Sequence, residues 1–267
     1  ILDKLYAHVF GAEAALVRTH FVSGTHAIFK TVFAMMRPGD QLVFATGTPY
    51  DTLKRSFSHL SRWDIDYKEV PLRDGLPDIE AIVNSLSAKT KAVMVQRSRG
   101  YQNRQSLSVS QIGQIMEAVK KYRSDIICIV DNCYGEFVEK MEPPQVGVDL
   151  TVGSLIKNPG GGIAPAGGYV VGREDLVEEV AESLTAPGLG SEMGASLADP
   201  RSLYQGFYLA PHVVAEALKG AVFAAGLYAK LGFEVSPHYS DIRSDIVQAI
   251  KMDSTERLKE FCHYIQA

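Results

Sequence analysis

Two residues of this sequence place reactive side chains just after apolar runs. Asp131 follows the run IICIV, and Lys157 lies 26 residues further along, close behind the run LTVGSL. A carboxylate held at the end of a buried strand stays charged only beside a cationic partner, because an unpaired buried charge is costly. A lysine after a strand is usually a solvated loop charge, so the role of Lys157 depends on what surrounds it.

Other polar groups fall at neighbouring strand ends. Ser23, Gly24 and Thr25 open a helical pattern in SGTHAIF, and Tyr50 comes shortly after the run QLVFAT. The free N–H groups and dipole of a helix N-terminus bind anions such as phosphate, and a tyrosine can lie flat on a ring. A phosphate site, a ring surface, a carboxylate and an amine together predict a site for pyridoxal 5′-phosphate. The amine would hold its aldehyde as a Schiff base, and the carboxylate would keep its ring nitrogen protonated.

Short apolar runs alternate with longer helical patterns along the chain. Most runs lack period-two alternation, which is typical of strands buried on both faces. We expect strands at residues 41–46, 91–96, 125–130, 150–155 and 167–172. We expect helices at 25–36, 79–86, 108–123 and 206–230, with Ser108 or Ser110 capping the third. This alternation predicts an α/β fold with a largely parallel sheet, helices on both faces and ligands beyond the carboxyl ends of the strands.

The rhythm changes in the last part of the chain. After the long helical pattern, the runs 232–237 and 245–250 are strand candidates of a smaller unit. We therefore predict a large cofactor-binding domain over residues 1–225 and the beginning of a small α+β domain over residues 226–267. The sequence starts without methionine inside one helical pattern and stops inside another, so we expect a fragment that is truncated at both ends.

Composition argues against several classes of partner. The 267 residues are 46% hydrophobic and 22% charged, with a formal net charge of −4. Without a basic excess, nucleic acid and anionic membrane surfaces are not expected partners. No apolar run reaches the roughly 18 residues of a membrane span, and no secretory signal pattern is present, so we expect a cytoplasmic protein. The three cysteines lack metal-ligand spacing, so no metal site is expected.

Longer motifs show a family resemblance. VDNCYGEF around Asp131, GSLIKNPGGG around Lys157, SGTHAI and the Tyr-x-Thr of Tyr50 and Thr52 resemble the cysteine/methionine-metabolism group of pyridoxal-phosphate enzymes. More narrowly, SLIKNPGGGIAPAGGY and RSLYQGFYLAPHVVAEALKGA are similar to the bacterial methionine gamma-lyase-like family, also called the aluminium resistance protein family. The resemblance covers nearly the whole chain. It implies the aspartate-aminotransferase-like fold, fold type I, with a seven-stranded type of sheet.

The resemblance implies catalytic roles for three residues. Lys157 would hold the cofactor as a Schiff base and later move the proton of the substrate's alpha carbon. Asp131 would pair with the pyridine nitrogen. Tyr50 would stack on the ring and act as an acid or base near the leaving group, although a tyrosine here could also belong to the core.

The same resemblance implies a set of phosphate contacts. The backbone amides of Gly24 and Thr25 would bind the phosphate together with Ser23 and Ser154. Ser154 could equally be a small strand residue, and it matters only if its side chain faces the same side as Lys157. The glycines after the lysine do not fit a dinucleotide fingerprint, because a proline occupies the third position and a strand follows.

The implied activity is that of a carbon–sulfur lyase acting on a sulfur-containing amino acid, like methionine gamma-lyase or a cystathionine lyase. Elimination would release a thiol, ammonia and a 2-keto acid. Neither the substrate nor the choice between beta and gamma elimination follows from the sequence. Two alternatives stay open: another reaction on this scaffold, such as transamination or decarboxylation, and a catalytically silent relative with a stress or metal-resistance role. The S-x-x-K spacing of penicillin-binding proteins is rejected, because neither S-D-N nor K-T-G occurs.

Substrate and subunit contacts are the least defined part of the site. Where better-known lyases carry an asparagine–proline segment near the cofactor, this chain reads QRSRGYQNR. Arg97 or Arg99 could contact the cofactor's phenolic oxygen or the substrate carboxylate, and a solvated basic loop is the alternative. The group's usual carboxylate-binding arginine lies beyond the end of this chain. The resemblance also implies a small amino-acid substrate and a homodimer or homotetramer with the active site at the subunit interface.

Overall fold

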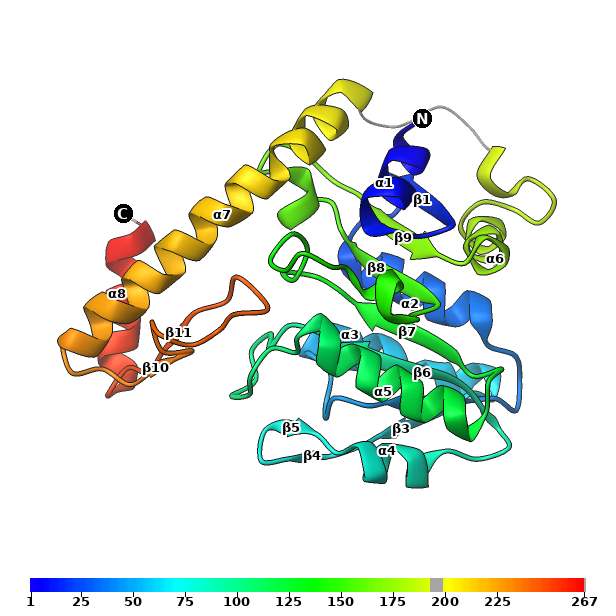
Figure 1. The fold of residues 1–267 in the computed structure, drawn as a ribbon, viewed down its shortest axis with the longest axis horizontal. Coiled ribbons are helices and arrows are strands. Elements are labelled where there is room, and N and C mark those ends of the chain that lie inside the picture. The colour runs from blue at the N-terminus through cyan, green and yellow to red at the C-terminus, as the bar shows by residue number, and fades with distance from the viewer. Residues whose placement is uncertain (193–198, 267) are drawn as a thin grey trace.

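Strands buried on both faces form the centre of the molecule. In the computed structural model, which describes residues 1–192 and 199–266, they make a seven-stranded sheet in the order β1-β9-β8-β7-β6-β2-β3 (Figure 1). Its strands are β1 (Ala14–Arg18), β2 (Gln41–Phe44), β3 (Asp66–Glu69), β6 (Thr90–Gln96), β7 (Ile127–Asp131), β8 (Leu150–Ser154) and β9 (Gly168–Gly172). Only β9 runs antiparallel to its neighbours within this sheet. The predicted α/β architecture with a largely parallel sheet is confirmed.

The five strands predicted from apolar runs are all present, and the structure adds two at the edges of the sheet. Edge strand β3 has the sequence DYKE, in which exposed and half-buried residues alternate. Edge strand β1 pairs only with β9 within the sheet. An edge strand has one neighbour and less to bury, so β3 lacks the continuous apolar run by which the central strands were predicted. Strand β1 has a short apolar run, AALV, which was not assigned to a strand.

Helices cover both faces of the sheet. They are α1 (Leu2–Phe10), α2 (Gly24–Met35), α3 (Asp51–Ser58), α4 (Ile79–Ser85), α5 (Val109–Tyr122) and α6 (Glu174–Leu184). Helices α2, α3 and α6 pack on one face, and α4 and α5 pack on the other. Ser108 caps α5 through a capping box with Gln111, which confirms one of the two predicted caps.

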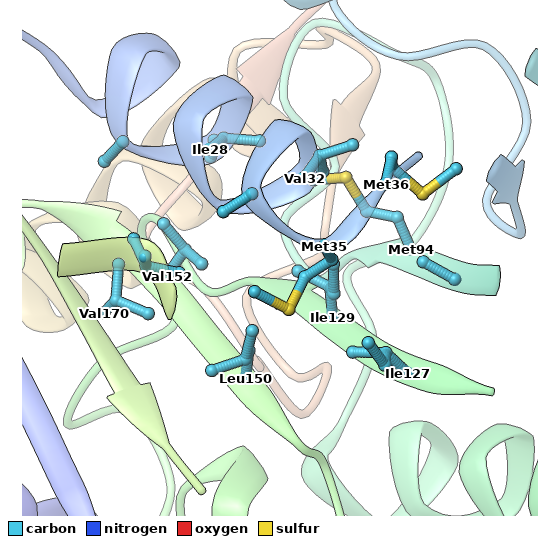
Figure 2. Close-up of a cluster of buried hydrophobic side chains, with 14 of the residues drawn as sticks. Ile28, Val32, Met35, Met36, Met94, Ile127, Ile129, Leu150, Val152 and Val170 are labelled. Atoms are coloured by element: carbon cyan, nitrogen blue, oxygen red, sulfur yellow. The ribbon is translucent and has the colours of Figure 1, made fainter. Parts of the chain in front are cut away.

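Alternating residues of each central strand supply the two halves of the core. In β7, Ile127 and Ile129 pack under α2 in the cluster of Figure 2. Cys128 and Val130, from the same strand, pack under α5. Complete burial of an aliphatic side chain contributes about 1.5–3 kcal/mol. The apolar strand is therefore held rigidly from both sides, and this fixes the position of Asp131 at its carboxyl end.

The last part of the chain stands apart from the sheet. Helix α7 (Pro200–Lys230) runs from beside α1 to the short antiparallel pair β10 (Val235–Ser236) and β11 (Ala249–Ile250), and α8 (Thr255–Gln266) follows (Figure 1). A second short pair, β4 (Leu72–Arg73) and β5 (Leu76–Pro77), lies after β3. Helix α7 continues through residue 225, and the division into domains there stays a prediction. Within the described ranges, no helix combines the length and the apolar character that crossing a bilayer requires.

A close backbone contact attaches α7 to the loop that follows β8. A Cβ atom at Gly206 would overlap the carbonyl oxygen of Gly160, and one at Gly161 would overlap the carbonyl oxygen of Gly206. The helix therefore lies directly against the short 3-10 turn Asn158–Gly160, which begins one residue after Lys157. Glycine at position 206 is required by this contact, whereas a Cβ at Gly220 in the same helix would meet nothing within 4 Å.

Alanine substitutions at these two glycines of α7 should act in opposite directions. Gly206→Ala should lower the free energy of unfolding by about 1–3 kcal/mol, because the methyl group cannot be accommodated without moving the helix. The matched control Gly220→Ala should raise it by up to about 1 kcal/mol, because alanine has the higher helix propensity at an exposed position. Urea unfolding followed by circular dichroism measures both. Equal stabilities of the two variants would contradict the close contact.

Candidate functional site

A cavity of about 1150 Å³ lies at the carboxyl ends of β6, β7 and β8. One wall comes from these strand ends and from the beginnings of α2 and α3, and the opposite wall comes from residues 234–236 and 246–251. Most of the predicted site residues line it together: Ser23, Gly24, Thr25, Tyr50, Arg99, Asp131, Ser154 and Lys157. The cavity therefore lies where the sequence predicts a ligand site, beyond the carboxyl ends of the parallel strands.

Asp131 is a buried carboxylate with few contacts. One of its oxygens, Oδ1, accepts a hydrogen bond of 3.1 Å from the backbone N–H of Cys133. The other, Oδ2, has no hydrogen-bond partner among the residues that the structure describes. Burial raises the pKa of Asp131, and the positive charge of Lys157 only partly offsets this. A second cation placed against Oδ2 would keep the group charged.

Lys157 supplies the amine of the cavity. Its Nζ atom lies 4.0 Å from the centre of the Tyr134 ring, a cation–π distance. No carboxylate oxygen lies within 4.0 Å of Nζ in the described part of the chain, so Lys157 and Asp131 share the cavity without forming an ion pair. Burial alone would lower the pKa of Lys157, but the surrounding acidic groups, led by Cys133 and Asp131, outweigh it and raise the pKa.

The beginning of α2 forms a cradle for an anion. The side chain of Ser23 caps the helix by accepting a 3.1 Å hydrogen bond from the N–H of His26. The N–H groups at the start of a helix have no acceptor within it, so those of Gly24 and Thr25 stay available at the cavity wall. A Cβ at Gly24 would lie 2.8 Å from the Cβ of Ser154, which shows how closely β8 approaches this helix start. Ser154 therefore faces the cavity, as its predicted role requires.

Tyr50 joins this cradle from the N-cap position of α3. Its hydroxyl lies 3.2 Å from Oγ1 of Thr25, and the hydroxyl of Thr52 is 3.5 Å from the same atom. Burial, reinforced by the charge of Asp131, raises the pKa of Tyr50. The phenol is therefore protonated at neutral pH, so it can act as a proton or hydrogen-bond donor and not as a base, and the raised pKa makes it a weaker acid than a free tyrosine.

The structure separates the two arginines that the sequence treated together. Arg99 lines the cavity, whereas Arg97 is completely buried and does not. The Arg97 guanidinium contacts Glu139 at 2.8 Å and Glu142 at 3.4 Å. The hypothesis that Arg97 binds the cofactor oxygen or the substrate is not supported by this position. Its burial also rules out the solvated basic loop that was the alternative.

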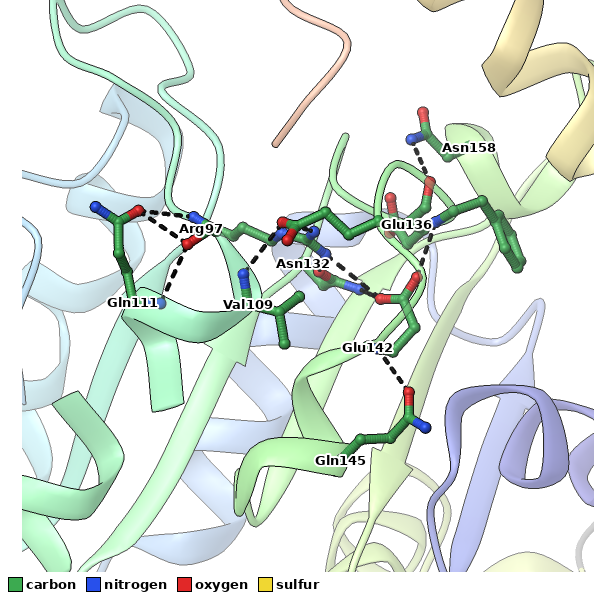
Figure 3. A network of polar contacts seen from close by, with 11 residues as sticks. Arg97, Val109, Gln111, Asn132, Glu136, Glu142, Gln145 and Asn158 are labelled. Atoms are coloured by element: carbon green, nitrogen blue, oxygen red, sulfur yellow. Dashed lines mark hydrogen bonds and ion pairs between the residues drawn. The ribbon is translucent and has the colours of Figure 1, made fainter. Parts of the chain in front are cut away.

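Arg97 instead belongs to a polar network behind the cavity (Figure 3). It donates a 2.7 Å hydrogen bond to Oδ1 of Asn132, and Nδ2 of Asn132 donates at 2.9 Å to Glu142. Glu142 also accepts from the backbone N–H of Phe137 at 2.8 Å. Asn158, next to Lys157, donates to the backbone carbonyl of Glu136 at 3.0 Å. This network joins the loops after β6, β7 and β8, and so it fixes the turn that carries Asp131 relative to the lysine.

Some cavity residues were missed by sequence reasoning. Tyr134 was not among the predicted site residues, but it lines the cavity, and the lysine amine lies over its ring. Its backbone has a positive φ of 71°, which no residue type in VDNCYGEF signalled. The strands predicted at 232–237 and 245–250 are present in part as β10 and β11, but their place in the cavity wall was missed, because these short, half-polar segments carry no motif.

Comparisons with known proteins agree on one family. A family model described as methionine gamma-lyase matches residues 1–267. The uncharacterized protein YnbB of Bacillus subtilis is 46% identical over 99% of this chain and 65% of its own length. The chain thus spans slightly less than two thirds of that relative.

Solved structures agree in fold over almost the full chain. One from Listeria monocytogenes, provisionally described as a cystathionine beta-lyase involved in aluminum resistance, has a TM-score of 0.97 at 45% identity and is matched over 100% of this chain and 68% of its own. A carbon-sulfur lyase involved in aluminum resistance from Clostridium novyi has a TM-score of 0.94 at 46% identity, over 98% of this chain and 64% of its own. With a family model that matches from the first residue to the last, the chain belongs to the methionine gamma-lyase family.

Proposed function

We propose that this chain is part of a pyridoxal-phosphate-dependent carbon–sulfur lyase of fold type I, which eliminates a thiol from a sulfur-containing amino acid. The observation that carries the proposal is the shared cavity of Lys157 and Asp131, in which the amine and the carboxylate face a common space without forming an ion pair. The names of the relatives support the reaction class. The chain spans 65% of the length of the relative YnbB, so the activity of a whole protein of that length is part of the proposal.

The donor set of the cavity fits pyridoxal phosphate. Oδ2 of Asp131 lacks a partner among the described residues and is suited to a protonated ring nitrogen. The start of α2, with Gly24, Thr25 and the adjacent Ser154, is suited to the phosphate. The Lys157 amine is suited to the aldehyde, and Tyr50 offers a ring face between these groups. Each end of the cofactor thus has a complementary group in the cavity.

The residues of this chain would then divide the work of elimination. When bound, pyridoxal phosphate supplies an electron sink for the charge left on the substrate's alpha carbon. Asp131 stabilises positive charge at the cavity floor. Lys157 would hold the cofactor covalently and, once released from it, would take the alpha proton on Nζ. Tyr50, protonated at neutral pH, would donate its proton to the departing sulfur.

We also propose two contacts beyond the cofactor. Arg99 lines the cavity and is suited to the carboxylate of an amino-acid substrate. A homodimer or homotetramer would place a second subunit at the cavity, and the exposed Tyr101 at its edge supports such a contact. Size measurement of the full protein by light scattering checks the assembly, and a monomer would contradict it.

Replacing Lys157 with alanine should abolish covalent attachment of the cofactor. Borohydride reduction of the unchanged protein with bound pyridoxal phosphate should label the peptide that contains Lys157, as shown by mass spectrometry. The variant should lose this label and about 10²- to 10⁴-fold of the turnover rate. Lys251→Ala is the matched control, because Lys251 lines the same cavity but is exposed and paired with Glu234 at 2.7 Å. Label on Lys251, or label that survives in the Lys157 variant, would overturn the assignment.

Replacing Asp131 with asparagine should remove a pH dependence as well as activity. Because burial raises the pKa of Asp131 in the free protein, cofactor affinity should fall as the pH drops through that raised pKa and the carboxylate takes up a proton. In the Asp131→Asn variant, this fall of cofactor affinity at low pH should be absent, and turnover should be lower by about 10²- to 10³-fold. Cofactor affinity is measured across pH for the unchanged protein and for Asp131→Asn, and the ratio of the two values reports on Asp131 alone. Titration of Lys157 and of the phosphate is common to both proteins and cancels in this ratio. A constant ratio would contradict the role.

The reaction itself is tested with the full protein and a panel of sulfur-containing amino acids. Carbon–sulfur elimination should release equal amounts of 2-keto acid, ammonia and thiol. Conversion of the cofactor to its amine form, without release of thiol, would indicate a transaminase instead.

A further inference from the structure

A buried carboxylate from the C-terminal part of the chain is bonded to the loop after β6. Asp245 is 0% exposed. Its Oδ2 atom accepts hydrogen bonds from the Ser98 hydroxyl at 2.8 Å and from the backbone N–H of Arg99 at 3.1 Å. Its Oδ1 atom accepts from the backbone N–H of Val247 at 3.1 Å. Asp245 therefore ties two opposite walls of the cavity to each other.

Arg99 lies at the cavity wall in a defined orientation. Its Nε donates to the carbonyl oxygen of Gln102 at 3.2 Å, and its Nη1 donates to the carbonyl and hydroxyl oxygens of Ser236 at 2.8 and 2.9 Å. Nη2 donates to the Asn103 side chain at 3.2 Å. All of these acceptors are neutral. A guanidinium has five N–H donors, so one of those on Nη2 remains for a ligand.

The positive charge in this region is not compensated locally. Arg99, Arg104 and Arg243 are 3%, 4% and 9% exposed. No acidic oxygen lies within 4.0 Å of their guanidinium nitrogens in residues 1–192 and 199–266. Burial lowers the pKa of all three arginines, and the negative charge of Asp245 only partly offsets this. Asp241 also acts on Arg243 and Asp131 on Arg104, but none of these carboxylates forms an ion pair with the three guanidinium groups, which suits an anionic ligand group beside the cavity.

We propose that Asp245 is a positioning residue that fixes Arg99 at the cavity wall as the anchor for the substrate's alpha-carboxylate. The inference rests on the proposed function, because it assumes an amino acid bound beside the cofactor. Asp245 holds the backbone of Arg99 through one hydrogen bond and the preceding residue through another, while Ser236 holds the guanidinium. Binding of the substrate carboxylate by Arg99 therefore depends on the hydrogen bonds that attach the wall of Ser236 and Asp245 to the loop after β6.

The test compares two probes that differ only in the carboxylate. L-Norleucine and n-pentylamine have the same amine and carbon chain, and neither carries a leaving group. Their binding to the full protein with bound pyridoxal phosphate is followed by the change in the cofactor's visible absorbance. The unchanged protein should bind norleucine more tightly than pentylamine. Asp245→Asn should weaken norleucine binding by about 10- to 100-fold, the value of a hydrogen bond to a charged group, and should leave pentylamine binding unchanged.

Two further variants complete the design. Asp241→Asn is the matched control, since Asp241 lies in the same segment, is exposed and accepts a hydrogen bond from His238; it should change neither affinity. Ser98→Ala removes the hydroxyl partner of Asp245 and should weaken norleucine binding selectively, even if the Asp245 variant does not fold.

The possible failures are distinguishable. A variant that loses both affinities equally, or only stability, would reduce Asp245 to a structural role. Absence of any preference for norleucine in the unchanged protein would overturn the carboxylate subsite. Absence of bound cofactor would overturn the proposed function itself.

Discussion

The cost of burying a negative charge at Asp131 is the constraint on which the site depends. The carboxylate stands at the end of a strand that is apolar on both faces, so it cannot move toward water without disrupting the core. The backbone N–H and side chain of Cys133, the charge of Arg104 and a lysine outside ion-pair distance leave it incompletely stabilised, because burial still raises its pKa. The folded protein already carries the free-energy cost of burying this carboxylate. A ligand that brings a cation to Oδ2 relieves that cost, and the relief adds to its binding energy. This makes the carboxylate a source of affinity and not only a structural feature.

Arg97 shows how a buried charge is arranged when no ligand is needed. It lies at the end of β6, next to β7, and is buried as deeply as Asp131. Two glutamates and an asparagine side chain surround its guanidinium. Its ion pairs are made within the described part of the chain, with Nε left without a partner there, and the network holds the loops that flank the cavity. Comparing the partners of these two buried charges, rather than their burial, distinguishes a structural residue from one that faces a ligand.

The sequence was most informative where one physical requirement dominated a short segment. Continuous apolar runs predicted the central strands, and the helix start in SGTHAIF predicted the anion cradle. Edge strand β3 was not predicted, because its exposed residues are polar and it has no apolar run. Arg97 and Arg99 could not be told apart because their partners, Glu139 and Asp245, lie far away along the chain. Contacts of this kind depend on how the chain closes on itself, and neither periodicity nor local motifs record them.

Helix α7 explains how such distant segments meet. Near its beginning, the contact of Gly206 with Gly160 fixes it against the loop that carries Lys157. At its other end it packs on β10, whose residue Ser236 holds the Arg99 guanidinium. Pro211 lies inside the helix between these two contacts and has no N–H to donate to the helix ladder, so α7 joins its two ends without being uniformly stiff. The amine and the proposed carboxylate anchor are thus connected through the same helix, which links the two walls of the cavity.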